Sequence, residues 1–160
     1  MPLGSKSIKK VDDESKQFII DCLNGDLTHG FDLDSIYYYE NTWHIFEYLK
    51  CESDHMTPHT SNPKYYPYNW RKFYNLYVLS RQLNGVLRLV NYSTRESDGD
   101  LVCLMKVVGF DYDKIRDYED SDEKPPKLEY MTLETTKLTR DQFSQALRRM
   151  NRRATLPPAL

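Results

Sequence analysis

Apolar and polar residues follow two different rhythms along this chain, and the two rhythms separate its helices from its strands. Apolar positions spaced three or four residues apart predict helices over residues 12–23 and 69–83, and a third from residue 139 onward. Alternation with a period of two, or a short run of β-forming residues, predicts strands. We expect these strands at residues 33–39, 43–51, 86–92, 101–110 and 128–135.

Cap and turn residues mark the ends of several of these elements. Asn24-Gly25 and Asn84-Gly85 are typical helix C-terminal signals. Glu40-Asn41-Thr42 separates two strand-like runs and predicts a hairpin, while Thr139-Arg140-Asp141-Gln142 reads as a capping box. The order is helix, hairpin, helix, strands, helix, which predicts an α/β sandwich with a central mixed β-sheet flanked by helices.

The length of 160 residues suits a single domain. Residues 1–5 resemble the remnant of an expression tag, so the predicted domain covers residues 6–153 and a flexible tail covers 154–160. Three scattered cysteines argue against a disulfide framework and fit a reducing compartment. No apolar run approaches the roughly 20 residues of a membrane span. The sequence therefore predicts a cytoplasmic protein with no membrane partner.

The formal net charge of −2 conceals a segregation of the charges. Residues 56–95 contain no acidic side chain but several basic ones, whereas residues 111–123 are rich in acids. The basic residues of the first segment are Lys64, Arg71, Lys72, Arg81, Arg88 and Arg95. A basic face of this kind is compatible with binding to nucleic acid.

Two carboxylates flank the predicted hairpin turn. Asp34 begins the first strand and Glu47 lies within the second, so the hairpin should bring them together. Paired carboxylates can hold a hard cation such as Mg²⁺ or Mn²⁺, and a nearby ammonium group can orient an attacking water. Lys50 is the nearest candidate for that ammonium.

An aspartate on one strand, then an acid and a lysine on the next, then a loop, a helix and a further strand resembles the PD-(D/E)XK nuclease superfamily. The resemblance covers roughly residues 12–110 and implies the restriction-endonuclease-like fold, whose core is a helix, a three-stranded meander, a helix and a strand. It implies that Asp34 and Glu47 bind metal and that Lys50 assists the nucleophile. Glu14, on the first helix, lies where some members carry an additional acid, and Glu52 is a further candidate ligand.

The spacing of the lysine departs from the family pattern. The family has one residue between acid and lysine, whereas Tyr48 and Leu49 separate Glu47 from Lys50. Strand side chains alternate, so Glu47 and Lys50 would point to opposite faces of a regular strand. A β-bulge at Tyr48-Leu49 would restore a common face. Otherwise Lys50 acts together with Glu52, or the site is inactive.

Aromatic residues are interleaved with the basic ones in the acid-free segment. Many of them, such as Phe73, Tyr74 and Tyr77, have helical spacing and are predicted to belong to the core. The basic and aromatic residues in the loop before this helix, and the basic residues in its first turn, are predicted to contact nucleic acid. These predicted contacts are Lys64, Tyr65, Tyr66, Arg71 and Lys72.

The sequence thus predicts a Mg²⁺- or Mn²⁺-dependent endonuclease that hydrolyses DNA, with RNA as an alternative substrate. A small domain without a separate recognition module suggests a homodimer or a subunit of a larger nucleic-acid-processing complex. A phage or mobile-element origin would suit such a nuclease by analogy with the fold. The alternative hypothesis is a catalytically inactive module of the same fold that binds nucleic acid or a protein partner.

Overall fold

The computed structural model describes residues 14–119 and 129–160. The chain divides into two units, Met1–Asp32 and Leu33–Leu160. In the described part of the first unit, α1 (Glu14–Leu23) has no buried residue, and Lys16 Nζ lies 3.7 Å from Asp32 Oδ2. Asn24 has a φ of 47° and Gly25 a φ of 95°, so the predicted glycine-containing end of this helix is confirmed. The predicted start at residue 12 lies outside the described residues.

The second unit is built on a mixed sheet, whose five strands in the described residues follow the order β1-β2-β3-β4-β5. The parallel pair is β2 and β3, which α2 (Trp70–Gln82) connects, and the other neighbouring strands are antiparallel. The strands are β1 (Ser35–Tyr39), β2 (Thr42–Lys50), β3 (Val86–Tyr92), β4 (Leu101–Phe110) and β5 (Met131–Thr139).

The predictions for β3 and β4 are confirmed at both ends, while β5 lies further along the chain than predicted. Its pairing with β4 extends to Leu101↔Thr139, so tertiary contacts carry the strand as far as the start of the last helix. The described residues between α1 and α2 contain two strands, whereas the core of the PD-(D/E)XK superfamily has a three-stranded meander. The α/β class with a mixed sheet is confirmed.

Turn chemistry explains the sharp elements. Glu40 and Asn41 have φ of 49° and 59°, so a two-residue turn with left-handed residues closes the β1–β2 hairpin. Thr139 accepts a hydrogen bond from the Gln142 N–H, and the Gln142 side chain accepts one from the Thr139 N–H. The predicted capping box at the start of α3 (Arg140–Arg153) is therefore confirmed.

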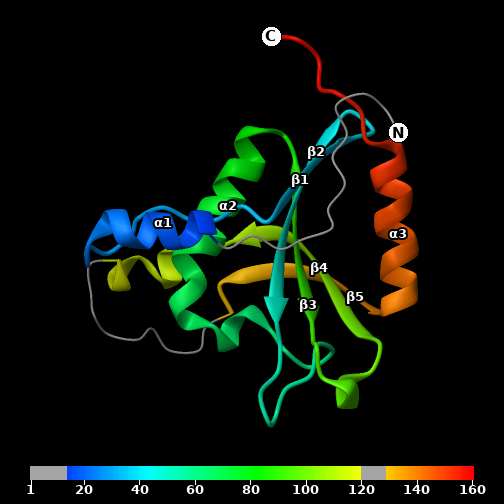
Figure 1. Ribbon diagram of the computed structural model, residues 1–160, viewed down its shortest axis with the longest axis horizontal. Coiled ribbons are helices and arrows are strands. Elements are labelled where there is room, and N and C mark those ends of the chain that lie inside the picture. The colour runs from blue at the N-terminus through cyan, green and yellow to red at the C-terminus, as the bar shows by residue number, and fades with distance from the viewer. Residues whose placement is uncertain (1–13, 120–128) are drawn as a thin grey trace. The chain divides into compact units, whose positions relative to one another are not determined.

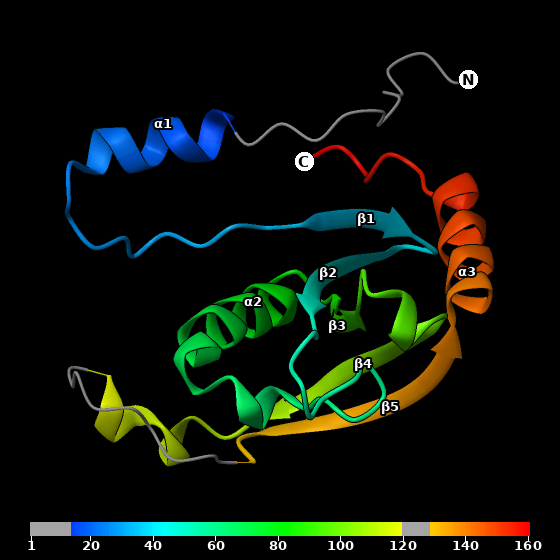
Figure 2. The same cartoon turned by 60° about the horizontal axis from the view of Figure 1, so that its bottom comes forward.

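The two helices of the second unit lie on opposite sides of its sheet (Figures 1 and 2). Because strand side chains alternate, Ile45 and Leu49 of β2 pack in one cluster with the buried residues of α2, while Phe46 packs in a second cluster with Met150 of α3. The α2 residues of the first cluster are Trp70, Phe73 and Leu76. The sheet thus has an α2 face and an α3 face, each with its own apolar core.

The charged sequence of residues 111–127, which follow β4, predicts a loop. Its described part contains two short 3₁₀ helices, Tyr112–Lys114 and Arg116–Tyr118, and Ile115 between them is fully buried in the core on the α2 face. Residues 120–127 of the predicted loop lie outside the described part. Throughout residues 14–119 and 129–160, no helix is long and apolar enough to cross a bilayer.

Candidate metal-binding site on the α2 face

The β1–β2 hairpin brings Asp34 and Glu47 together, as predicted. Ser35 pairs with Phe46, and continuing this antiparallel register by one residue sets Asp34 opposite Glu47. Asp34 Oδ2 accepts a hydrogen bond of 2.9 Å from the Tyr48 N–H, which fixes the aspartate at the edge of β2. Because the two side chains lie opposite one another, the charge of Asp34 helps to raise the pKa of Glu47.

Glu47 is buried, with only 3% of its surface exposed. Its Oε1 forms an ion pair with the ammonium group of Lys72. Its Oε2 is buried and has no hydrogen-bond partner among the described residues. A buried carboxylate oxygen without a partner is costly, so this atom marks a place where a cation would be stabilised.

The pKa of Glu47 is raised from 4.5 to about 7. Burial is the largest cause, because it disfavours the charged form. The hydrogen bond and the charge of Lys72 oppose the rise, and the neighbouring Asp34 adds to it. Two acidic groups in a poorly solvated place repel each other, which is the condition that a bound divalent cation relieves.

The ammonium of the site comes from Lys72 and not from Lys50. Lys72 lies in the first turn of α2, one helical repeat before the buried Leu76 and two before the buried Ser80. It was predicted to contact nucleic acid, but the structure directs it inward to Glu47. The helical period was the signal that could have found it, since it puts Lys72 on the stripe that faces the sheet.

Lys50 is not brought together with Glu47. The register of β2 with β3 is continuous from His44↔Val86 to Lys50↔Tyr92, so the β-bulge that would have restored a common face for Glu47 and Lys50 is absent from this strand. Lys50 therefore points to the opposite face from Glu47. It is exposed, with its Nζ 3.4 Å from Glu52 Oε2.

Of the two additional predicted acids, Glu52 is engaged away from Glu47. Glu52 Oε1 accepts hydrogen bonds from the backbone N–H and the hydroxyl of Thr94, and these bonds are the largest cause of the lowered pKa of Glu52. Glu14 belongs to the first unit, so it is described apart from the hairpin. Within the described ranges, no group of three or more His, Cys, Asp or Glu side chains could hold a metal ion. The candidate site is thus a pair of carboxylates with one lysine.

The remaining predicted nucleic-acid contacts lie around the start of α2. Lys64 forms an ion pair of 2.9 Å with Glu129, and its Nζ lies 5.6 Å from the centre of the Tyr65 ring. The Tyr66 hydroxyl is 2.9 Å from Ser61 Oγ, in a half-buried position, which makes it a packing contact and not an open stacking surface.

Arg71 remains beside the site. It directly precedes Lys72, and its guanidinium carbon lies 5.1 Å from the centre of the Trp70 ring. No ion pair joins Arg71 to a carboxylate in the part of the chain that the structure describes.

Comparison of the chain with protein-family models, with curated proteins and with solved structures finds no match in any of the three.

Proposed function

We propose that the Leu33–Leu160 unit is a metal-dependent endonuclease that hydrolyses DNA phosphodiester bonds, using Asp34, Glu47 and Lys72. The observation that carries the proposal is the buried Glu47 Oε2, which lacks a hydrogen-bond partner among the described residues and belongs to a carboxylate beside a second one. Oxygen donors of this kind suit Mg²⁺ or Mn²⁺, which take few protein ligands and keep several waters.

Asp34 and Glu47 would hold the cation. When bound, a divalent cation offsets the negative charge that develops on the scissile phosphate and on the leaving oxygen. Burial and, to a lesser extent, the neighbouring Asp34 raise the pKa of Glu47, and a bound cation would favour the ionised pair, so binding should be tighter at higher pH. Glu47 lies within β2, and Asp34 directly precedes β1 and accepts a hydrogen bond from the Tyr48 N–H, so the hairpin keeps the pair preorganised.

Lys72 is proposed as the group that positions the attacking water. A lysine ammonium has three N–H donors, and the contact with Glu47 leaves donors for a water and a phosphate oxygen. Fixing the water in line with the phosphorus lowers the entropic cost of the reaction. The same ammonium would stabilise the negative charge of hydroxide as the water gives its proton to the surrounding solvent.

The start of α2 supports the choice of a phosphodiester substrate. The positive end of a helix attracts phosphate, and here it also carries Arg71 next to Lys72. Tyr68, just before the helix, is 70% exposed and offers an aromatic ring at the same end.

The three free cysteines favour a reducing compartment and hence a cytoplasmic setting. Two copies of the unit, or one copy in a larger complex, would allow both strands to be cut.

An inactive binding module is the second candidate, and one observation favours it. The ion pair between Lys72 and Glu47 already satisfies one carboxylate oxygen without a metal, as a purely structural pair would. Such a protein would bind DNA through the basic start of α2 without cutting it.

A plasmid-nicking assay separates the two. We expect the wild-type protein to nick supercoiled DNA with Mg²⁺ or Mn²⁺ and not with EDTA. Asp34→Ala and Glu47→Ala should abolish nicking, and Lys72→Met should slow it by about 10²- to 10⁴-fold. Lys50→Met is the matched control, because it removes a lysine from the same hairpin on the other face, and it should leave the rate unchanged. DNA binding without metal-dependent nicking would reject the nuclease and support the binding module. Cleavage of RNA in preference to DNA would reassign the substrate.

A further inference from the structure

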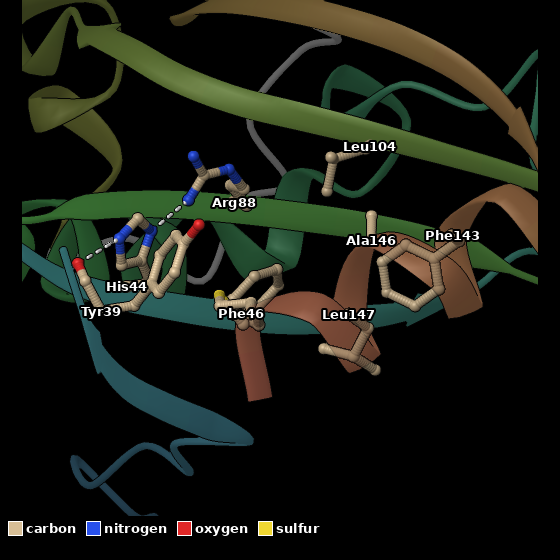
Figure 3. Close-up of a pocket in the computed structure, with 9 residues that line it drawn as sticks. Tyr39, His44, Phe46, Arg88, Leu104, Phe143, Ala146 and Leu147 are labelled. Carbon is tan, nitrogen blue, oxygen red and sulfur yellow. Dashed lines mark hydrogen bonds between the residues drawn. The ribbon is translucent and has the colours of Figure 1, made fainter. Parts of the chain in front are cut away.

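A separate pocket lies on the α3 face of the sheet, between the strands and α3. Its volume is about 200 Å³ and its lining is largely apolar. Figure 3 shows Phe46 and Leu104 on the strand side of the pocket and Phe143, Ala146 and Leu147 on the helix side. Because Phe46 and Glu47 point to opposite faces of β2, this pocket is distinct from the candidate metal site.

Arg88 and His44 form the polar end of the pocket. Arg88 Nη1 lies 2.7 Å from His44 Nδ1, and His44 Nε2 lies 3.3 Å from the carbonyl oxygen of Tyr39 (Figure 3). A guanidinium group can only donate, so Nδ1 must accept, and the imidazole proton is on Nε2, where it is donated to Tyr39. His44 is therefore neutral, and burial and the charge of Arg88 both lower its pKa.

The charge of Arg88 is consequently not balanced by its neighbour. No ion pair joins Arg88 to a carboxylate within the described residues, and its guanidinium carbon lies 5.9 Å from the centre of the Phe46 ring. The second terminal nitrogen points away from His44 (Figure 3). Burial of this partly buried guanidinium lowers its pKa, so the charge is held at a cost that an anion would relieve.

The surroundings limit the ligand to a single negative charge. Lys106, which pairs with Arg88 across β3 and β4, has its Nζ 3.8 Å from Glu134 Oε2. One uncompensated guanidinium with a planar pair of donors matches a carboxylate better than a phosphate dianion, which needs more donors. The volume also limits the size, since a cavity of about 150 Å³ holds benzene, and drug-sized ligands fill about 300 Å³ or more.

We propose that this pocket binds a small organic carboxylate, with an apolar body of about six to nine carbon atoms against Phe46 and Phe143 and its carboxylate on Arg88. The proposal does not depend on nuclease activity. It assigns a ligand site to the α3 face of the sheet.

Isothermal titration calorimetry on the full chain tests the proposal with 3-phenylpropionate as the probe. We expect saturable binding with one ligand per chain. The uncharged 3-phenylpropionamide, which has the same body, and acetate, which has the same head, should each bind at least tenfold more weakly. Inorganic phosphate should not compete.

Two variants of different kinds locate the site. Arg88→Gln removes the charge, and Ala146→Leu fills the pocket from an exposed position on α3 where leucine is a good helix former. Each should weaken binding of 3-phenylpropionate by tenfold or more, while the control Arg81→Gln, on the exposed side of α2, should leave it unchanged. Absence of saturable binding, equal binding of the amide, competition by phosphate, or undiminished binding by Ala146→Leu would each overturn the proposal. If Arg88→Gln does not fold, Ala146→Leu and the comparison of 3-phenylpropionate with its amide still test the proposal.

Discussion

Glu47 should make the folded protein less stable as the pH rises, and replacing it with glutamine should remove this effect. In the unfolded chain the carboxyl loses its proton near its ordinary pKa of 4.5, whereas in the folded protein it keeps the proton up to about pH 7. Below pH 4.5 both states hold the proton and the stability is fully present. Between pH 4.5 and about 7 only the unfolded state ionises, so stability is lost across this window.

The size of the loss follows from the gap between the two pKa values. A gap from 4.5 to about 7 corresponds to about 3 kcal/mol of unfolding free energy. Little of this is screened by solvent, since Glu47 is 3% exposed. The loss is large compared with a typical total stability of about 5–15 kcal/mol. Glutamine cannot ionise, so the Glu47→Gln protein should gain about 3 kcal/mol relative to the wild type between pH 4.5 and pH 8.

Urea titrations in EDTA, followed by tryptophan fluorescence at several pH values, measure this difference. Subtracting the wild-type profile from the variant profile cancels the other titrating groups. Glu134→Gln is the matched control, because it makes the same chemical change at an exposed position on β5. A flat profile for Glu47→Gln, or one that falls with pH, would refute the reasoning that desolvation outweighs Lys72 in the environment of Glu47.

Four further outcomes are expected. Mg²⁺ at 100 times its dissociation constant should raise the unfolding free energy of the wild type by about 2.7 kcal/mol in urea titrations, and Asp34→Asn should reduce the increase. Gly85→Ala should cost about 1–3 kcal/mol in the same assay, because a β-carbon there would lie 2.6 Å from the Trp43 carbonyl oxygen; an unchanged value would show that the backbone can yield. Thr139→Ala should cost about 1 kcal/mol by removing the cap of α3, and a loss below about 0.3 kcal/mol would contradict this. Phe73→Ala should cost about 3–5 kcal/mol, because this ring is fully buried in the core on the α2 face; a much smaller loss by thermal or urea unfolding would mean that the core collapses around the cavity.

Local chemistry made most element boundaries predictable. The hairpin turn requires left-handed backbone at Glu40 and Asn41, and Asn84, just beyond the end of α2, has a φ of 51°. These signals act within a few residues, so the sequence alone reveals them. The far end of β5 was not predictable in this way, because its length is set by pairing with β4.

The candidate site was predictable only in part, for a different physical reason. Asp34 and Glu47 lie on the two arms of one hairpin, so their proximity follows from a single turn. The identity of the lysine depends on which side of α2 faces the sheet, and this is a matter of tertiary packing. Nearness in sequence favoured Lys50, although its spacing departs from the family pattern, and the unbroken register of β2 turns it away from Glu47. Arg88 and His44 are 44 residues apart in sequence and lie on different strands, so no local sequence pattern predicts their contact.

Phe46 and Glu47 are adjacent in β2, so a change in the length of this strand would affect both faces of the sheet. Deleting or inserting one residue upstream in this strand would swap the phenyl ring and the carboxylate between helices, spoiling both environments at once. Substitutions should therefore accumulate here far more readily than single-residue length changes.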